Sequence, residues 1–256
     1  MLKTARLKAA LGAACAATLL LATTSAQATD LVVSAAASLT NAFKELAQSF
    51  EQQHPGVKVI TNFGASDILM QQIVRGAPAD VFASADQTAM DKAVAEKAVD
   101  SSTRKNFAAN QIVVIVPHDA RVHPATLADL TGAGYQRIAL GNPASVPFGR
   151  YTKAALEQAG LWTQVQAKGV MAENVRTSLD YVARGEVDAG FVFATDAAVM
   201  PEKVKVALRI PSTTPATYPI AVTAGTRQPA LAAQFVAHVL SASGQAVLAR
   251  YGFQKP

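Results

Sequence analysis

The stretch LVVSAAASLTNAFKELAQSF, residues 31–50, contains the pattern that decides the fold. It opens with a short apolar run, Leu-Val-Val, of the kind found in buried strands. Leu39, Phe43, Leu46 and Phe50 then follow at the spacing of one helix face. A proline soon afterwards predicts that the helix ends before it. A strand that leads directly into a helix is the repeating unit of α/β proteins.

The same strand and helix order occurs twice more along the chain. Strands are predicted at 57–60 and 80–83, and helices at 68–74 and 88–97. Gly76 stands where a helix stop is expected. Three consecutive strand and helix pairs indicate a mainly parallel sheet that is covered by helices on both faces.

A second alternating block lies between two longer apolar strands, residues 111–116 and 218–222. Within it, strands are predicted at 137–140 and 189–193, and helices at 148–158 and 174–184. We interpret the two long strands as crossings between two lobes. Lobe I then comprises 29–111 and 222–256, and lobe II comprises 112–221. One continuous domain is the alternative interpretation.

The first 28 residues have the layout of a secretory signal peptide. Basic residues come first, an apolar stretch covers 9–22, and Ala26-Gln27-Ala28 supplies an A-x-A cleavage site. A membrane anchor is the alternative, but the apolar run is shorter than the roughly 20 residues that a span needs, and no second span follows it. We therefore predict that residues 1–28 are a signal peptide and that the mature protein is periplasmic.

Cysteine content and charge exclude several classes of protein. The single cysteine, Cys15, lies within the predicted signal peptide, so the mature chain has no disulfide and depends on its hydrophobic core. The formal charge of +5 includes three basic residues of the signal peptide, which leaves about +2. This small balance does not indicate nucleic-acid binding.

Four predicted helix starts are the candidate binding site. Ser38 and Ser66 each open a helix directly after a strand, and so lie at the carboxyl edge of a sheet, where open α/β folds bind ligands. In the second block, helices begin at Phe148 and Val175. A helix start offers unpaired N–H groups and a partial positive charge. Two starts from each lobe therefore favour the capture of one small anion.

Other chemistries fit the sequence less well. Residues 64–68, GASDI, resemble a nucleophile elbow around Ser66, but a second glycine is missing at Ile68. His118 and His123 lie in a polar stretch typical of a solvated loop instead of a metal site. A serine at a helix start is, taken alone, most often only a cap. We also expect the nearby Arg150 and Arg176 to be solvated and to raise only the local potential.

Longer motifs that include these residues resemble a known family. They are AAASLT at 35–40, GAPADVFASAD at 76–86, GNP at 141–143 with VPFG at 146–149, and RYGF at 250–253. In this order they resemble the periplasmic molybdate-binding proteins of bacterial ABC importers, the ModA family. The resemblance implies a type II periplasmic-binding-protein fold, with two α/β lobes that each contain a mainly parallel sheet flanked by helices and are joined by a hinge.

The same resemblance implies a function and partners. Such a protein is not an enzyme and needs no cofactor. It captures molybdate or tungstate between its lobes, so that molybdenum is bound as an oxyanion and not through direct protein ligands, and it delivers the anion to the membrane permease of the importer. A monomer is the usual state. Sulfate or another tetrahedral oxyanion is the alternative ligand.

The resemblance also assigns roles to individual residues. Ser38 and Ser66 match two serines that donate hydroxyl and backbone hydrogen bonds, and Phe148 and Val175 match positions that donate a backbone N–H. Phe193 stands where some members have a tyrosine whose hydroxyl contacts the oxyanion. A phenylalanine cannot donate, so one bond to the anion is missing, replaced by water or supplied from elsewhere. The bond is worth roughly 1.5–3 kcal/mol, or about one to two powers of ten in affinity.

Overall fold

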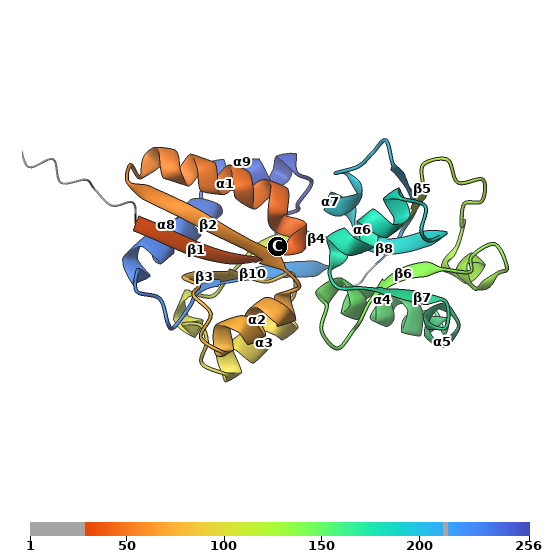
Figure 1. Cartoon of the computed structure of the whole chain (residues 1–256), viewed down its shortest axis with the longest axis horizontal. Coiled ribbons are helices and arrows are strands. Elements are labelled where there is room, and N and C mark those ends of the chain that lie inside the picture. Colours follow the sequence, from red (N-terminus) through yellow and green to blue (C-terminus); the bar gives the residue numbers. More distant parts are fainter. Residues whose placement is uncertain (1–28, 212–214) are drawn as a thin grey trace, which may run out of the picture.

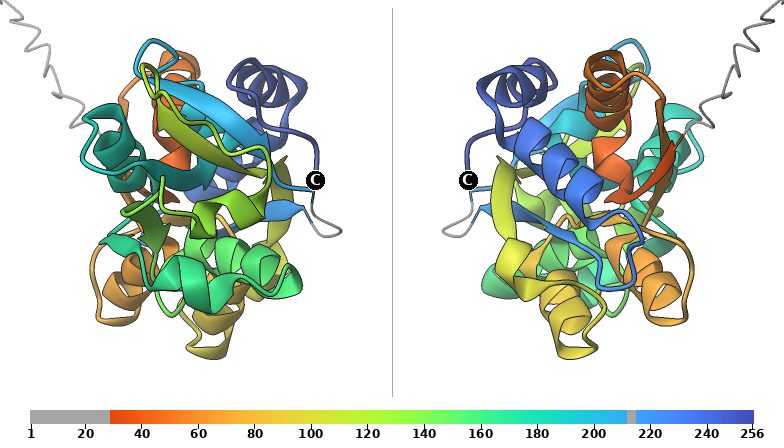
Figure 2. Two further views of the ribbon diagram at one scale, coloured as in Figure 1. Left: turned by 90° about the vertical axis from the view of Figure 1, so that its right-hand side faces the viewer. Right: turned by 90° about the vertical axis from the view of Figure 1, so that its left-hand side faces the viewer.

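The computed structural model describes residues 29–211 and 215–256, and the predicted signal peptide, residues 1–28, lies outside them. The chain folds into two α/β lobes that lie side by side along the long axis of the molecule (Figure 1). Each lobe contains one five-stranded sheet, and the end-on views show helices on both faces of the sheet (Figure 2). The predicted two-lobed fold is therefore confirmed.

Lobe I contains the first strands of the chain and its C-terminal part. Its sheet has the order β2-β1-β3-β10-β4. The strands are β1 (Thr29–Ala36), β2 (Val57–Gly64), β3 (Val81–Ala83), β4 (Lys105–Asn110) and β10 (Ala216–Val222). The helices are α1 (Thr40–Gln53), α2 (Ser66–Val74), α3 (Gln87–Ala95), α8 (Pro229–Leu240) and α9 (Ala242–Arg250), with short 3-10 turns η1 (Ala37–Leu39) and η2 (Ser101–Thr103). β1 pairs in parallel with β2 and β3, whereas β10 is antiparallel to both of its neighbours.

Lobe II repeats this plan with the middle part of the chain. Its sheet has the order β7-β6-β8-β5-β9. The strands are β5 (Ile112–Pro117), β6 (Ile138–Gly141), β7 (Gly169–Ala172), β8 (Ala189–Phe193) and β9 (Val204–Arg209). The helices are α4 (Pro147–Gln158), α5 (Trp162–Gln166), α6 (Val175–Ala183) and α7 (Ala194–Ala197), with the 3-10 turn η3 (Leu127–Thr131). β6 is parallel to β7 and β8, and β5 is antiparallel to both of its neighbours.

One of the two crossings between the lobes differs from the sequence prediction. We expected residues 112–221 in lobe II, but β10, which begins at Ala216, pairs with β3 and β4 in the sheet of lobe I. The second crossing therefore lies between β9 and β10, whereas the first, between β4 and β5, agrees with the predicted boundary at 111/112. An apolar strand such as β10 fits the interior of either sheet, so its composition does not show which sheet it joins.

Aromatic rings join the cores of the two lobes. Tyr218 on β10 of lobe I packs against Phe193 at the end of β8 in lobe II, with ring centroids 5.7 Å apart. Phe193 also packs against Tyr151 of α4, at 6.2 Å. Behind Tyr218, Phe107 and Phe253 lie at 6.3 and 5.5 Å. The lobes are therefore in direct contact beside the crossings.

Candidate functional site

A small cavity lies between the lobes, and all five residues predicted for the site line it. They are Ser38, Ser66, Phe148, Val175 and Phe193. The volume of the cavity is about 10 Å³, whereas sites for organic ligands occupy roughly 300–1,000 Å³. Its size therefore fits a small ion better than an organic molecule.

The strand registers explain why the four helix starts converge. In lobe I, Ala36 at the end of β1 pairs with Gly64 at the end of β2, so these parallel strands end level. In lobe II, Gly141 and Ala172 end β6 and β7 in the same way. Each of these strands is followed within a few residues by a helix. Two helix starts per lobe consequently lie side by side at the carboxyl edge of each sheet, and the two edges face each other across the cavity.

The serine hydroxyls are held by partners that leave them able to donate. The Ser66 Oγ accepts a hydrogen bond of 3.0 Å from the amide of Ala85, so its own proton is available to the cavity. The Ser38 Oγ lies 3.0 Å from the hydroxyl of Tyr218. Both serines are buried.

Backbone amides complete the set of donors. Asn174 caps helix α6 with its side-chain oxygen, which accepts from the amides of Arg176 at 2.9 Å and Thr177 at 3.2 Å. This cap does not include the amide of Val175, the first residue of the helix. No described residue accepts a hydrogen bond from the amides of Ser38, Ser66, Phe148 or Val175. Those four N–H groups are unpaired at the helix starts.

Arg150 is paired and mostly buried, which contradicts our expectation that it is solvated. Its Nη2 lies 2.6 Å from Asp67 and its Nε 2.6 Å from Asp86, and its side chain is 19% exposed. Both aspartates belong to lobe I, and Arg150 belongs to α4 of lobe II. Lys92 also contacts Asp67, at 2.7 Å. Arg150 therefore forms an ionic bridge between the lobes.

Arg176 is neutralised within lobe II, which also contradicts the expected solvated state. Its Nε lies 2.5 Å from the fully buried carboxylate of Asp196. Burial raises the pKa of Asp196 to about 6, and the charge of Arg176 acts in the opposite direction. Because both arginines near the cavity are engaged by aspartates, the cavity is lined by uncharged donors.

Phe193 forms an apolar wall of the cavity and supplies no donor. The hydroxyl of Tyr218, from lobe I, reaches the predicted site through its contact with Ser38. We did not single out Tyr218 from the sequence. A buried tyrosine usually has a hydrogen-bond partner for its hydroxyl, but the identity of that partner depends on the pairing of β10 in lobe I.

The described part of the chain has neither a serine–histidine pair at the cavity nor a cluster of metal ligands. No histidine contacts Ser66 among the described residues; the close serine and histidine pair, Ser49 and His238 at 2.7 Å, connects α1 and α8 away from the cavity. Within residues 29–211 and 215–256, no group of three or more His, Cys, Asp or Glu side chains is arranged to hold a metal ion.

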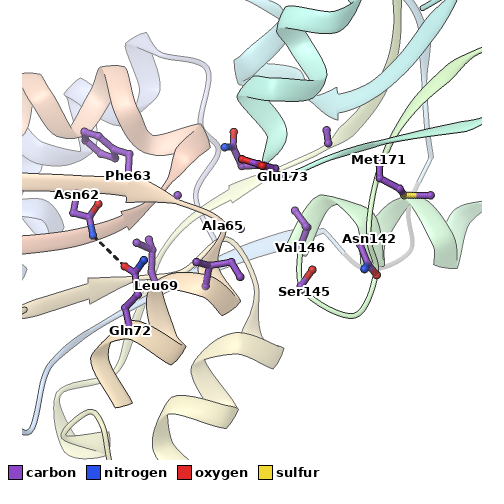
Figure 3. Close-up of a pocket in the computed structure, with 14 residues that line it drawn as sticks. Asn62, Phe63, Ala65, Leu69, Gln72, Asn142, Ser145, Val146, Met171 and Glu173 are labelled. Atoms are coloured by element: carbon purple, nitrogen blue, oxygen red, sulfur yellow. Dashed lines mark hydrogen bonds between the residues drawn. The ribbon is translucent and has the colours of Figure 1, made fainter. Parts of the chain in front are cut away.

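A wider groove of about 560 Å³ opens beside the cavity and shares part of its lining. Figure 3 shows side chains of lobe I, among them Asn62 and Gln72, facing Ser145 and Met171 of lobe II. The groove is larger than the cavity, but it does not include the serines of the predicted site. We interpret it as the solvent-facing side of the junction.

At Gly149, beside the site, neighbouring backbone atoms leave no room for a side chain. A Cβ at this position would lie 2.4 Å from the carbonyl oxygen of Gly141, because the first turn of α4 presses on the end of β6. We expect Gly149→Ala to destabilise the protein by about 1–3 kcal/mol and to lower the melting temperature by several degrees. Thermal unfolding followed by circular dichroism tests this. Gly225→Ala is the matched control, since its Cβ meets nothing within 4 Å; equal melting temperatures for both variants would contradict the prediction.

Two α/β lobes with a small cavity at their junction define the class of two-lobed solute-binding proteins. In agreement, residues 31–254 match the family described as bacterial extracellular solute-binding protein. The chain is 38% identical over 229 residues to the molybdate-binding protein ModA of Escherichia coli K12, covering 87% of this chain and 88% of that protein. It is 37% identical over 231 residues to ModA of Mycobacterium bovis, covering 90% and 86%. The chain therefore belongs to the ModA family of solute-binding proteins.

Solved structures agree with this assignment. The periplasmic molybdate-binding protein of Azotobacter vinelandii superimposes with a TM-score of 0.77 at 26% identity, over 88% of this chain and 99% of that one. The sulfate-binding protein SubI of Mycobacterium tuberculosis has the same TM-score at 18% identity, over 89% and 87%, and shows the shared fold. The family membership confirms the prediction of a binding protein that is not an enzyme, and its description places such proteins outside the cytoplasm.

Proposed function

We propose that this protein captures molybdate in the cavity between its lobes and delivers it to the membrane permease of an ABC importer. The observation that supports this most strongly is the convergence of two helix starts from each lobe on one small cavity that includes Ser38, Ser66, Phe148 and Val175. The relatives named for molybdate binding support the same ligand.

The donors of the cavity suit a fully ionised oxyanion. Molybdate carries two negative charges and no proton, so it needs only hydrogen-bond donors. Hydroxyl and amide groups at helix starts supply these donors, and the helix dipoles favour the negative charge. The lining of the cavity contains no carboxylate. An oxyanion that retains a proton, such as hydrogen phosphate, would lack a charged acceptor for it.

Tungstate has the same charge and shape as molybdate and nearly the same size, and we propose it as a second ligand. Sulfate shares the charge and shape but is smaller, and it remains the alternative ligand within the same class of site. We further propose that residues 1–28 direct the protein to the periplasm, that the mature protein acts as a monomer, and that the lobes close about the two crossings when the anion binds.

A thermal-shift panel of molybdate, tungstate, sulfate and phosphate tests the proposed ligand. A ligand at one hundred times its Kd stabilises the folded state by about 2.7 kcal/mol, so a true ligand raises the melting temperature clearly. We expect shifts with molybdate and tungstate and none with phosphate at the same concentration. A larger shift with sulfate than with molybdate would favour the alternative ligand, and no shift with any of the four would contradict the proposed function.

A further inference from the structure

A chain of buried hydrogen bonds connects the cavity with the junction of the lobes. It begins at Ser38, whose Oγ lies 3.0 Å from the hydroxyl of Tyr218. The Nδ2 of Asn110 lies 3.3 Å from the same hydroxyl and 2.8 Å from the Oγ1 of Thr195. The amide of Gln111 donates to the Oδ1 of Asn110 at 2.9 Å. Ser38, Tyr218, Asn110 and Thr195 are all at most 5% exposed.

The donor and acceptor in each of these hydrogen bonds can be assigned by starting from the bond between Gln111 and Asn110. A backbone N–H only donates, so the amide of Gln111 requires the oxygen of the Asn110 carboxamide to face it. The nitrogen then faces the other way, and its two protons are directed to Thr195 and Tyr218. The Tyr218 hydroxyl accepts one of them, and for its own buried proton the Oγ of Ser38 is the only acceptor in contact among the described residues. Ser38 accepts that proton and keeps its own for another acceptor.

We propose that Tyr218 and Asn110 are positioning residues that orient the Ser38 hydroxyl so that it only donates toward the cavity. This inference rests on the proposed function and extends it to the choice of ligand. With Tyr218 as the donor, the Ser38 proton has no acceptor among the described residues, so the hydroxyl presents this proton, and not a lone pair, to the ligand. The site therefore selects tetrahedral oxyanions without a proton over protonated ones.

Two further observations agree with this role. Ser66, the second serine of the cavity, is oriented in the same sense by a different partner, the amide of Ala85. Complete burial raises the pKa of the Tyr218 hydroxyl well above its usual value, so it retains its proton at any pH at which the protein functions. Both serine hydroxyls are thus supported by groups that donate to them.

This series of hydrogen bonds also depends on contact between the lobes. Asn110 is the last residue of β4 in lobe I, and Thr195 lies in α7 of lobe II. The bond between them therefore joins the lobes beside the first crossing. The orientation of the Ser38 hydroxyl is consequently supported from both lobes in the arrangement observed here.

The test is a double-mutant cycle of Tyr218→Phe and Ser38→Ala, measured by calorimetric titration with sodium molybdate. Tyr218→Phe removes the hydroxyl and keeps the ring that packs on Phe193. We expect it to weaken binding by about three- to tenfold in the parent protein, and to have almost no effect when Ser38 is already alanine, because it acts through that hydroxyl. Tyr135→Phe is the matched control, since the buried Tyr135 hydroxyl has no partner among the described residues.

A second readout separates positioning from a general structural effect. With the Ser38 oxygen released, Tyr218→Phe should lower the ratio of molybdate to phosphate affinity, which a loosened fold alone would not change selectively. The inference is overturned if Tyr218→Phe binds molybdate as tightly as the parent, or if its loss is equally large with and without Ser38. If the parent itself binds no molybdate in the same titration, the proposed function fails and this inference fails with it. If the parent binds and the cycle shows no coupling, only this inference fails.

Discussion

Alanine in place of Ser38 or Ser66 is expected to weaken molybdate binding by about ten- to a hundredfold each. A hydrogen bond to a charged group is worth roughly 1.5–3 kcal/mol, which corresponds to this range of affinity. Both hydroxyls line the cavity, and the bond from Ala85 to Ser66 leaves the Ser66 proton available. The loss should appear in the dissociation constant from calorimetric titration, while circular dichroism shows an intact fold.

Ser145→Ala is the control for the two serine variants. Ser145 lines the wider groove but not the cavity, so its loss should leave the affinity for molybdate unchanged. If Ser38→Ala and Ser66→Ala bind as tightly as the parent, the cavity is not the site. If Ser145→Ala weakens binding as strongly as they do, the anion lies in the groove instead.

Removal of the Arg150 side chain is expected to favour separation of the lobes. Arg150→Met leaves the aspartates of lobe I without their partner from lobe II. Breaking a pair that is mostly buried costs about 3–5 kcal/mol, because the remaining charge loses its compensation. Asp86 is 3% exposed and Asp67 is 1% exposed, so both carboxylates would gain stability by hydration in an open form. Their unbalanced charge would also repel a dianion close by.

Small-angle scattering and titration measure the two effects of this change. The ligand-free Arg150→Met protein should have a larger radius of gyration than the parent, and its molybdate affinity should fall by at least about tenfold. Lys153→Ala is the control on the same helix, because Lys153 and Glu157 form an exposed pair within lobe II at 3.5 Å that is worth little. Identical scattering and affinity for Arg150→Met and the parent would show that the ionic bridge does not hold the lobes together.

Local sequence patterns predicted the elements that form the site. Strand and helix periodicity placed Ser38 and Ser66 at helix starts after strands, and the structure has α2 beginning at Ser66 and a 3-10 turn around Ser38 that leads into α1. The site in lobe II followed in the same way, with α4 beginning at Pro147 and α6 at Val175. Such starts are visible in a sequence because periodicity and helix-start preferences are local.

Contacts between distant segments could not be predicted in this way. Arg150 reaches Asp67 and Asp86, which lie 83 and 64 residues away in the chain, and no local pattern marks such partners. The contact between Tyr218 and Ser38 spans 180 residues and requires β10 to join the sheet of lobe I. The charges and hydroxyls that surround the site are therefore fixed by topology, whereas the helix starts themselves are fixed by nearby residues.

Diffraction from crystals grown with molybdate, with data collected at the molybdenum absorption edge, tests the central claim most directly. We expect one anomalous peak in the cavity, with its oxygens within hydrogen-bond distance of the hydroxyls of Ser38 and Ser66 and the amides of Phe148 and Val175. Arg150 should remain paired with its aspartates. A peak outside the cavity, or an anion held by the guanidinium of Arg150 in place of the helix starts, would contradict the assignment.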